Sequence, residues 1–107
     1  YRFWGYNNDI DSGLSMTLNG WNMCVGVYQG SSAPYQQTYL NKIAGATASL
    51  GWNTTLTGYY YVGADTSYAV GTRAWYGNIA IVMTYNRVLS YSEILKNYIA
   101  TKGRFGL

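Results

Sequence analysis

Hydrophobic and polar residues alternate over residues 21–28 (WNMCVGVY), which predicts a β-strand with one buried face. Residues 75–87 (WYGNIAIVMTYNR) predict a second strand, the strongest in the chain. The apolar side of the first strand is formed by Trp21, Met23, Val25 and Val27. In the second stretch both sides are mostly apolar, with Ile79, Ile81, Met83 and Tyr85 on one and Ala80, Val82 and Thr84 on the other. We therefore expect residues 75–87 to form the central strand of a sheet that is covered on both faces.

Shorter runs predict further strands at residues 1–6, 35–43 and 59–63, because each is rich in aromatic or β-branched residues. Residues 7–13 (NNDIDSG) contain the Asn, Asp and Gly that are typical of turns. Residues 44–58 are small, polar and interrupted by glycine, so they are interpreted either as a long loop or as a weak edge strand.

One helix is predicted, over residues 91–102. Ser90 and Glu93 have the spacing of a capping box, in which each side chain binds the other residue's backbone N–H. An apolar stripe follows at Ile94, Leu95, Tyr98 and Ile99. Lys102 ends the helix and Gly103 can take the left-handed closing conformation. We expect the stripe to dock near an edge or end of a β-sandwich.

The composition of the 107-residue chain supports a single all-β domain over residues 1–107. Aromatic residues make up 18% and charged residues only 10%, which is unlike a helical bundle. The predicted fold is an antiparallel β-sandwich with one short C-terminal helix. Cys24 cannot form an internal disulfide, because it is the one cysteine, and is interpreted as a small buried strand residue.

The net charge of +3 does not suggest nucleic-acid binding, because the basic residues are scattered apart from a loose group near the C-terminus. No apolar run reaches membrane-spanning length, so membrane insertion is not expected. The absence of histidine removes the usual zinc sites and histidine-activated nucleophiles.

The C-terminal segment resembles the last long strand and following helix of concanavalin A-like lectin/glucanase domains, the laminin-G-like jelly rolls. The matching residues are Gly77, Ile79, Val82, Tyr85, Asn86, Arg87, Leu89, Ser90, Glu93 and Ile94. The strand that begins at Trp21 and the run YYYVGAD are similar to other strands of the family, whereas Asn41–Lys42 departs from its usual Asn-Gly turn. The ending KGRFGL resembles variants from tailed bacteriophages and their prophages.

The resemblance covers residues 15–107 and implies a concanavalin A-like jelly roll that is incomplete here, because whole domains of the family are commonly longer. We therefore expect residues 1–107 to be the C-terminal part of a longer chain. Open strand edges would then pair with the missing part, with a second copy or with another protein.

Glucanases of this superfamily need two facing carboxylates, and this chain has only Asp9, Asp11, Asp65 and Glu93. Since Glu93 is explained by the capping box and Asp9 and Asp11 by a turn, we expect no catalytic residues and no enzymatic activity. No cofactor or metal site is expected; calcium in NDIDSG or near Asp65 is the alternative, but the loop lacks a closing Glu.

Glycan binding would use exposed aromatic rings together with Asn or Asp hydrogen bonds. The candidates are Trp52, Asn53, Tyr60, Asp65, Tyr68, Trp75 and Tyr76. The alternative, that these rings pack within the sheets or between subunits, is the more common role of such residues.

Two functions follow from the resemblance. The first is a non-enzymatic structural or adhesion module on the surface of a phage virion, as a decoration, fibre or tail component. Its partners would be other virion proteins or copies of itself, with a host-surface glycan as a further ligand. The alternative is a carbohydrate-binding module of a secreted or cell-surface protein.

Overall fold

The computed structural model describes residues 1–3, 8–30, 35–49, 51, 62–63 and 74–107. The chain forms two compact units. The first contains Tyr1–Trp52 together with Tyr85–Leu107, and the second contains Asn53–Thr84. The single domain expected over residues 1–107 stays a prediction.

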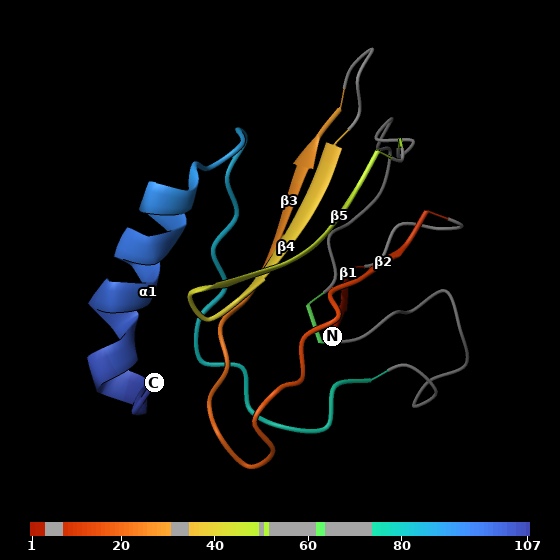
Figure 1. The fold of residues 1–107 in the computed structure, drawn as a ribbon. Coiled ribbons are helices and arrows are strands. Elements are labelled where there is room, and N and C mark those ends of the chain that lie inside the picture. Colours follow the sequence, from red (N-terminus) through yellow and green to blue (C-terminus); the bar gives the residue numbers. More distant parts are fainter. Residues whose placement is uncertain (4–7, 31–34, 50, 52–61, 64–73) are drawn as a thin grey trace. The chain divides into compact units, whose positions relative to one another are not determined.

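The first unit contains two antiparallel sheets (Figure 1). Strands β1 (Arg2–Phe3) and β2 (Ile10–Asp11) form a two-stranded sheet. Strands β3 (Cys24–Gln29), β4 (Tyr35–Leu40) and β5 (Ile43–Ala48) form a three-stranded sheet with β4 at its centre. The edge-strand interpretation of residues 44–58 is thus correct for the part in β5, and β2 lies inside the segment that was expected to be a turn.

The alternation predicted for residues 21–28 is confirmed in β3. Val27 is buried and Val25 half-buried on one face, while Cys24 and Gly26 are exposed on the other. The expectation of a buried Cys24 is therefore wrong, because period-two alternation places it opposite the valines. Strands β4 and β5 are joined at Asn41, which takes a left-handed conformation with φ of 55°, as asparagine tolerates.

Strand β4 buries three polar side chains, those of Gln36, Gln37 and Thr38, in addition to the apolar Leu40. The Gln37 Nε2 donates to the carbonyl oxygens of Thr38 at 2.9 Å and Gly45 at 2.8 Å, and the Thr38 hydroxyl donates to Ala46 O at 3.1 Å. The register between β4 and β5 shifts between Gln37 and Tyr39, so these side chains satisfy backbone groups beside an irregular step in the ladder. Gly45 is needed there, since a Cβ would lie 2.6 Å from both Ser12 O and Thr38 Oγ1.

Helix α1 extends over Tyr91–Phe105. Its N-cap is Ser90 and the predicted capping box with Glu93 is confirmed. The expected end at Lys102 and Gly103 is wrong, because Gly103 is helical and the left-handed cap is Gly106, with φ of 68°. The sequence offers two glycines after the stripe, and the second one closes the helix by donating its N–H to Lys102 O.

Helix α1 packs on the face formed by β3 and β4 (Figure 1). Ile94, at 1% exposure, joins Val27 and Leu89 in a buried cluster, against which Met23, Val25 and Tyr39 pack. Tyr98 is also buried, so docking through these two helix positions is confirmed. Leu95 is half-buried, and Ile99 is exposed at 55%, so Ile99 does not belong to the docking face. Among the described residues, no helix is long and apolar enough to span a membrane.

Residues 75–87 do not form the predicted central strand. All of them are described, and none is paired in a ladder; only Ala74, just before them, forms an isolated bridge. The side chains expected to be covered are exposed, including those of Ile79, Ile81, Val82 and Met83. Two apolar faces favour burial of a strand, but the strand also needs a neighbouring strand with which to pair.

Candidate functional site

The candidate glycan site is described only at Trp75 and Tyr76. The other candidates lie outside the described residues: Trp52, Asn53, Tyr60, Asp65 and Tyr68. Whether the chain brings all seven together therefore stays a prediction.

Trp75 and Tyr76 expose their rings, with 52% and 86% of each residue accessible. The backbone fixes Trp75, whose N–H donates to Gly63 O at 2.7 Å. Its indole lies over the Gly77 backbone, where a Cβ would come within 3.0 Å of Nε1. An anchored indole that is half open to solvent offers an apolar face and an N–H donor side by side. This combination suits a ligand with both apolar and hydroxyl surfaces, such as a sugar ring.

Two of the four carboxylates face an arginine. The Arg2 guanidinium lies 3.8 Å from the Asp9 carboxylate and 3.7 Å from that of Asp11. Asp11 also accepts a hydrogen bond from Gly13 N at 3.1 Å, as expected of a turn aspartate. Because a cationic side chain already lies beside both carboxylates, this loop is poorly suited to calcium.

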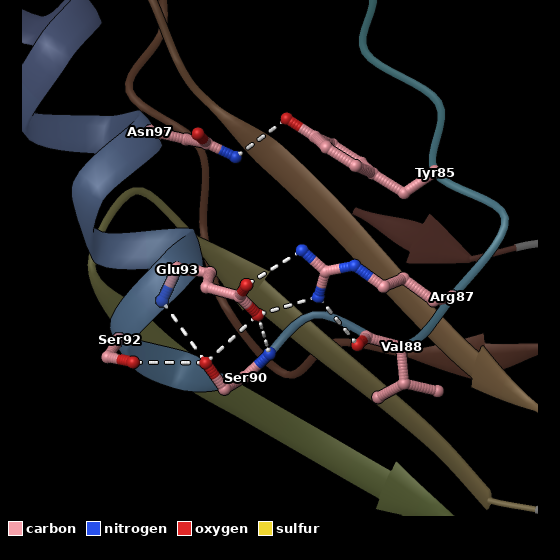
Figure 2. A network of polar contacts seen from close by, with 7 residues as sticks. All are labelled: Tyr85, Arg87, Val88, Ser90, Ser92, Glu93 and Asn97. Carbon is pink, nitrogen blue, oxygen red and sulfur yellow. Dashed lines mark hydrogen bonds and ion pairs between the residues drawn. The ribbon is translucent and has the colours of Figure 1, made fainter.

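The Glu93 carboxylate accepts hydrogen bonds from Arg87 and Ser90 (Figure 2). The Arg87 Nη2 and Nη1 donate to Oε1 at 2.7 Å and Oε2 at 2.9 Å, and Ser90 N donates to Oε2 at 2.9 Å. The Arg87 hydrogen bonds, followed by those from Ser90, lower the pKa of Glu93 to about 2. A general acid needs a pKa raised toward the working pH, so Glu93 has the opposite property. Its role is to cap α1.

No group of three or more potential metal ligands occurs among the residues that the structure describes. Asp65 lies outside them, so the calcium alternative at that residue stays open. The expectation of no catalytic residue, no metal and no cofactor likewise remains a prediction.

The structure also reveals two aromatic pairs that the sequence did not indicate. Trp21 and Phe105 have ring centroids 5.1 Å apart at an angle of 49°, and Tyr39 stacks on Tyr91 at 5.9 Å and 26°. The members of each pair are far apart in sequence, and docking of α1 brings them together. Tyr91 and Phe105 are each seven residues from Tyr98, so helical periodicity places them on the same side of α1 as the buried stripe. This is the signal that could have suggested that they reach neighbouring strands or loops.

The described part of the chain is thus an antiparallel β domain with a capped C-terminal helix and exposed aromatic side chains. The profile of the concanavalin A-like lectin/glucanases superfamily matches residues 1–95. The chain belongs to that superfamily, and its antiparallel sheets and C-terminal helix are consistent with a concanavalin A-like β-sandwich. A search of the curated proteins found no match.

A solved structure has a similar fold. It is the 2.1 Å crystal structure of residues 221–444 of an S-layer domain-containing protein from Clostridium thermocellum ATCC 27405. The TM-score is 0.65 at 20% sequence identity, and the match covers 84% of this chain. The chain covers 44% of that structure, less than half of its length. At 20% sequence identity, this similarity is evidence for a shared fold only.

Proposed function

We propose that the chain is a non-enzymatic binding module that is displayed on a surface and recognises glycans or proteins. The observation that carries the proposal is the anchored, half-exposed indole of Trp75 beside the exposed ring of Tyr76, in a domain of a lectin/glucanase superfamily. Large aromatic side chains with one apolar face and one polar atom are typical anchors of binding surfaces.

The three described carboxylates lie beside arginine side chains, which supports a binding function over glycoside hydrolysis. Glycoside hydrolysis needs one carboxyl group that is protonated near neutral pH and a second that faces it. Glu93 has a pKa of about 2 and is held by Arg87, while Asp9 and Asp11 lie beside Arg2. None of these three groups has the environment of a general acid.

The surface that we propose is that of a phage virion, where the module would act as a decoration, fibre or tail component. The ending KGRFGL, which resembles phage variants, supports this location. A cell-surface or secreted protein is the second candidate, and the fold shared with an S-layer domain-containing protein favours it. Antibodies against residues 1–107 distinguish the two: gold labelling of purified phage particles supports the first, and labelling of the cell envelope alone supports the second.

Glycan binding is tested by probing an array of bacterial-surface and plant-wall oligosaccharides with the purified protein. The variant Trp75→Ala removes the proposed anchor and should abolish the signals. Tyr91→Ala is the matched control, because Tyr91 is similarly exposed, at 49%, but lies at the start of α1. Equal binding by Trp75→Ala and the wild type would refute Trp75 as the anchor.

A further inference from the structure

The positive charge of the first unit is distributed unevenly, because its acidic groups are already paired. Arg2 lies beside Asp9 and Asp11, and Arg87 binds Glu93. The described residues show no ion pair that involves Lys96, Lys102 or Arg104, the three cations of α1. After Glu93 the helix contains no acidic residue, so no acidic side chain of the helix balances the positive charge of its C-terminal half.

An aromatic pair lies at this end of the helix. Trp21, which is 39% exposed, contacts the half-buried Phe105 with ring centroids 5.1 Å apart. The Arg104 Cζ lies 5.5 Å from the centroid of the Phe105 ring, within the range of a cation–π contact. Charge and exposed aromatic surface therefore occur together at the last turn.

Helical geometry places the two cations of the last turn on either side of Phe105. At about 100° per residue, Lys102 is about 60° to one side of Phe105 and Arg104 about 100° to the other. Lys96, nine residues before Phe105, lies on about the opposite side of the helix. The backbone at this end is fixed, since Gly106 N and Leu107 N both donate to Lys102 O.

We propose that the patch formed by Trp21, Lys102, Arg104 and Phe105 binds a saccharide chain that carries carboxylate or phosphate groups. A guanidinium and an ammonium attract such groups, and the arginine can hold them through two parallel hydrogen bonds. The Trp21 indole, which packs against Phe105, offers an apolar face to the ring of the same sugar. The inference rests on the proposed binding function and adds a second contact surface, of defined charge preference.

Cations at a helix C-terminus also stabilise the helix dipole. That effect depends only on their position along the helix and does not involve Trp21. The Trp21→Ala variant therefore separates the two roles, because it leaves both cations in place and removes only the aromatic surface.

The test is titration of the purified chain with polygalacturonate and with phosphorylated mannan, with neutral dextran and a poly(dT) oligonucleotide as comparisons. We expect both acidic polysaccharides to bind and dextran to leave the patch unoccupied. The double variant Lys102→Gln/Arg104→Gln and the single variant Trp21→Ala should each weaken binding at least tenfold. The control Lys42→Gln/Lys96→Gln removes the same charge from the β4–β5 turn and the opposite side of α1, and should change binding less than threefold.

Equal losses in the control and in Lys102→Gln/Arg104→Gln would show non-specific charge attraction and overturn the proposal. Stronger binding of poly(dT) than of either polysaccharide would identify a nucleic-acid surface instead. Circular dichroism and thermal melts show that the variants remain folded, and a wild-type salt titration gives a readout that does not depend on any variant. Salt-insensitive binding of the acidic polysaccharides would also contradict the proposal.

Failure of this patch as a binding site can be distinguished from failure of the proposed glycan-binding function. If Trp75→Ala abolishes all glycan binding while the Lys102→Gln/Arg104→Gln variant binds normally, the function holds and this patch is not part of it. If acidic polysaccharides bind through the patch and Trp75→Ala has no effect, the patch holds and the Trp75 anchor is wrong.

Discussion

Arg87 binds Glu93 through two parallel hydrogen bonds, from Nη2 to Oε1 at 2.7 Å and from Nη1 to Oε2 at 2.9 Å. The same carboxylate accepts the Ser90 N–H at 2.9 Å, so it joins the segment before the helix to the first turn (Figure 2). Asn97 extends the connection by donating to the Tyr85 hydroxyl at 3.1 Å. The motif Y-N-R-x-L-S-x-x-E therefore has a mechanical role: it fixes the direction in which α1 leaves residues 85–90.

The lowered pKa of Glu93 lets us predict how the stability of the fold depends on pH. The pKa of Glu93 falls from its ordinary 4.5 to about 2 in the folded chain, mainly because of the Arg87 hydrogen bonds. The charged form favours folding, so its contribution is complete above about pH 5 and is lost as the pH falls toward 2. Urea unfolding of the wild type and Glu93→Gln should therefore show a difference that is constant between pH 5 and 8 and shrinks below pH 4. If the difference in unfolding free energy between the two proteins stayed constant down to pH 2, the lowered pKa of Glu93 would be contradicted.

The Ser90 cap gives a second prediction. Ser90→Ala removes the hydroxyl that accepts the Glu93 N–H, and should lower the free energy of unfolding by about 1 kcal/mol. Ser92→Ala is the control, because Ser92 lies in the first turn and contacts only the Ser90 hydroxyl among the bonds of this network. Denaturant melts of both variants provide the comparison, and equal losses would mean that the cap is not the cause.

The docking of α1 is tested by two isoleucines on different sides of the helix. Ile94 is 1% exposed in the cluster with Val27 and Leu89, so Ile94→Ala should cost about 2–5 kcal/mol. Ile99 is 55% exposed, so Ile99→Ala should change the free energy of unfolding by less than about 0.5 kcal/mol. Similar costs at both positions, measured by urea unfolding, would show that the helix does not dock as described.

Two glycines should respond in opposite directions to substitution by alanine. A Cβ at Gly45 would lie 2.6 Å from Ser12 O, a backbone atom that cannot move cheaply, so Gly45→Ala should destabilise the fold. A Cβ at Gly103 meets nothing within 4 Å and the residue is helical, so Gly103→Ala should stabilise by about 0.5–1 kcal/mol. Thermal melting of the two variants checks both signs, and a stable Gly45→Ala variant would contradict the close approach of the Ser12 backbone to β5.

Local rules predicted the helix well because its signals are local. Ser90 and Glu93 are three residues apart, and Ile94 and Tyr98 are one turn apart. The structure has the N-cap and the buried face of the helix at these predicted positions. The predicted C-terminal end at Gly103 was wrong, because Gly106 also satisfies the rule for a closing glycine and is the one that takes the left-handed conformation.

Predictions that depended on distant partners were less successful. Residues 75–87 have the composition of a buried strand, but composition does not say whether a neighbouring strand is available. The burial of polar side chains in β4 could not be predicted either, because Gln37 is satisfied by backbone groups of β5. For the candidate site, the sequence identified Trp75 and Tyr76, whereas the Trp21–Phe105 pair depends on the docking of α1.

The most direct test of a binding, non-enzymatic role uses a glycan identified on the array. The chain is mixed with the glycan at saturating concentration, bound ligand is measured by calorimetry, and new reducing ends are measured over 24 hours in the same sample. We predict saturable binding that Trp75→Ala abolishes, with no more reducing ends than in buffer alone. Release of reducing ends that depends on the chain and persists after further purification would contradict this prediction.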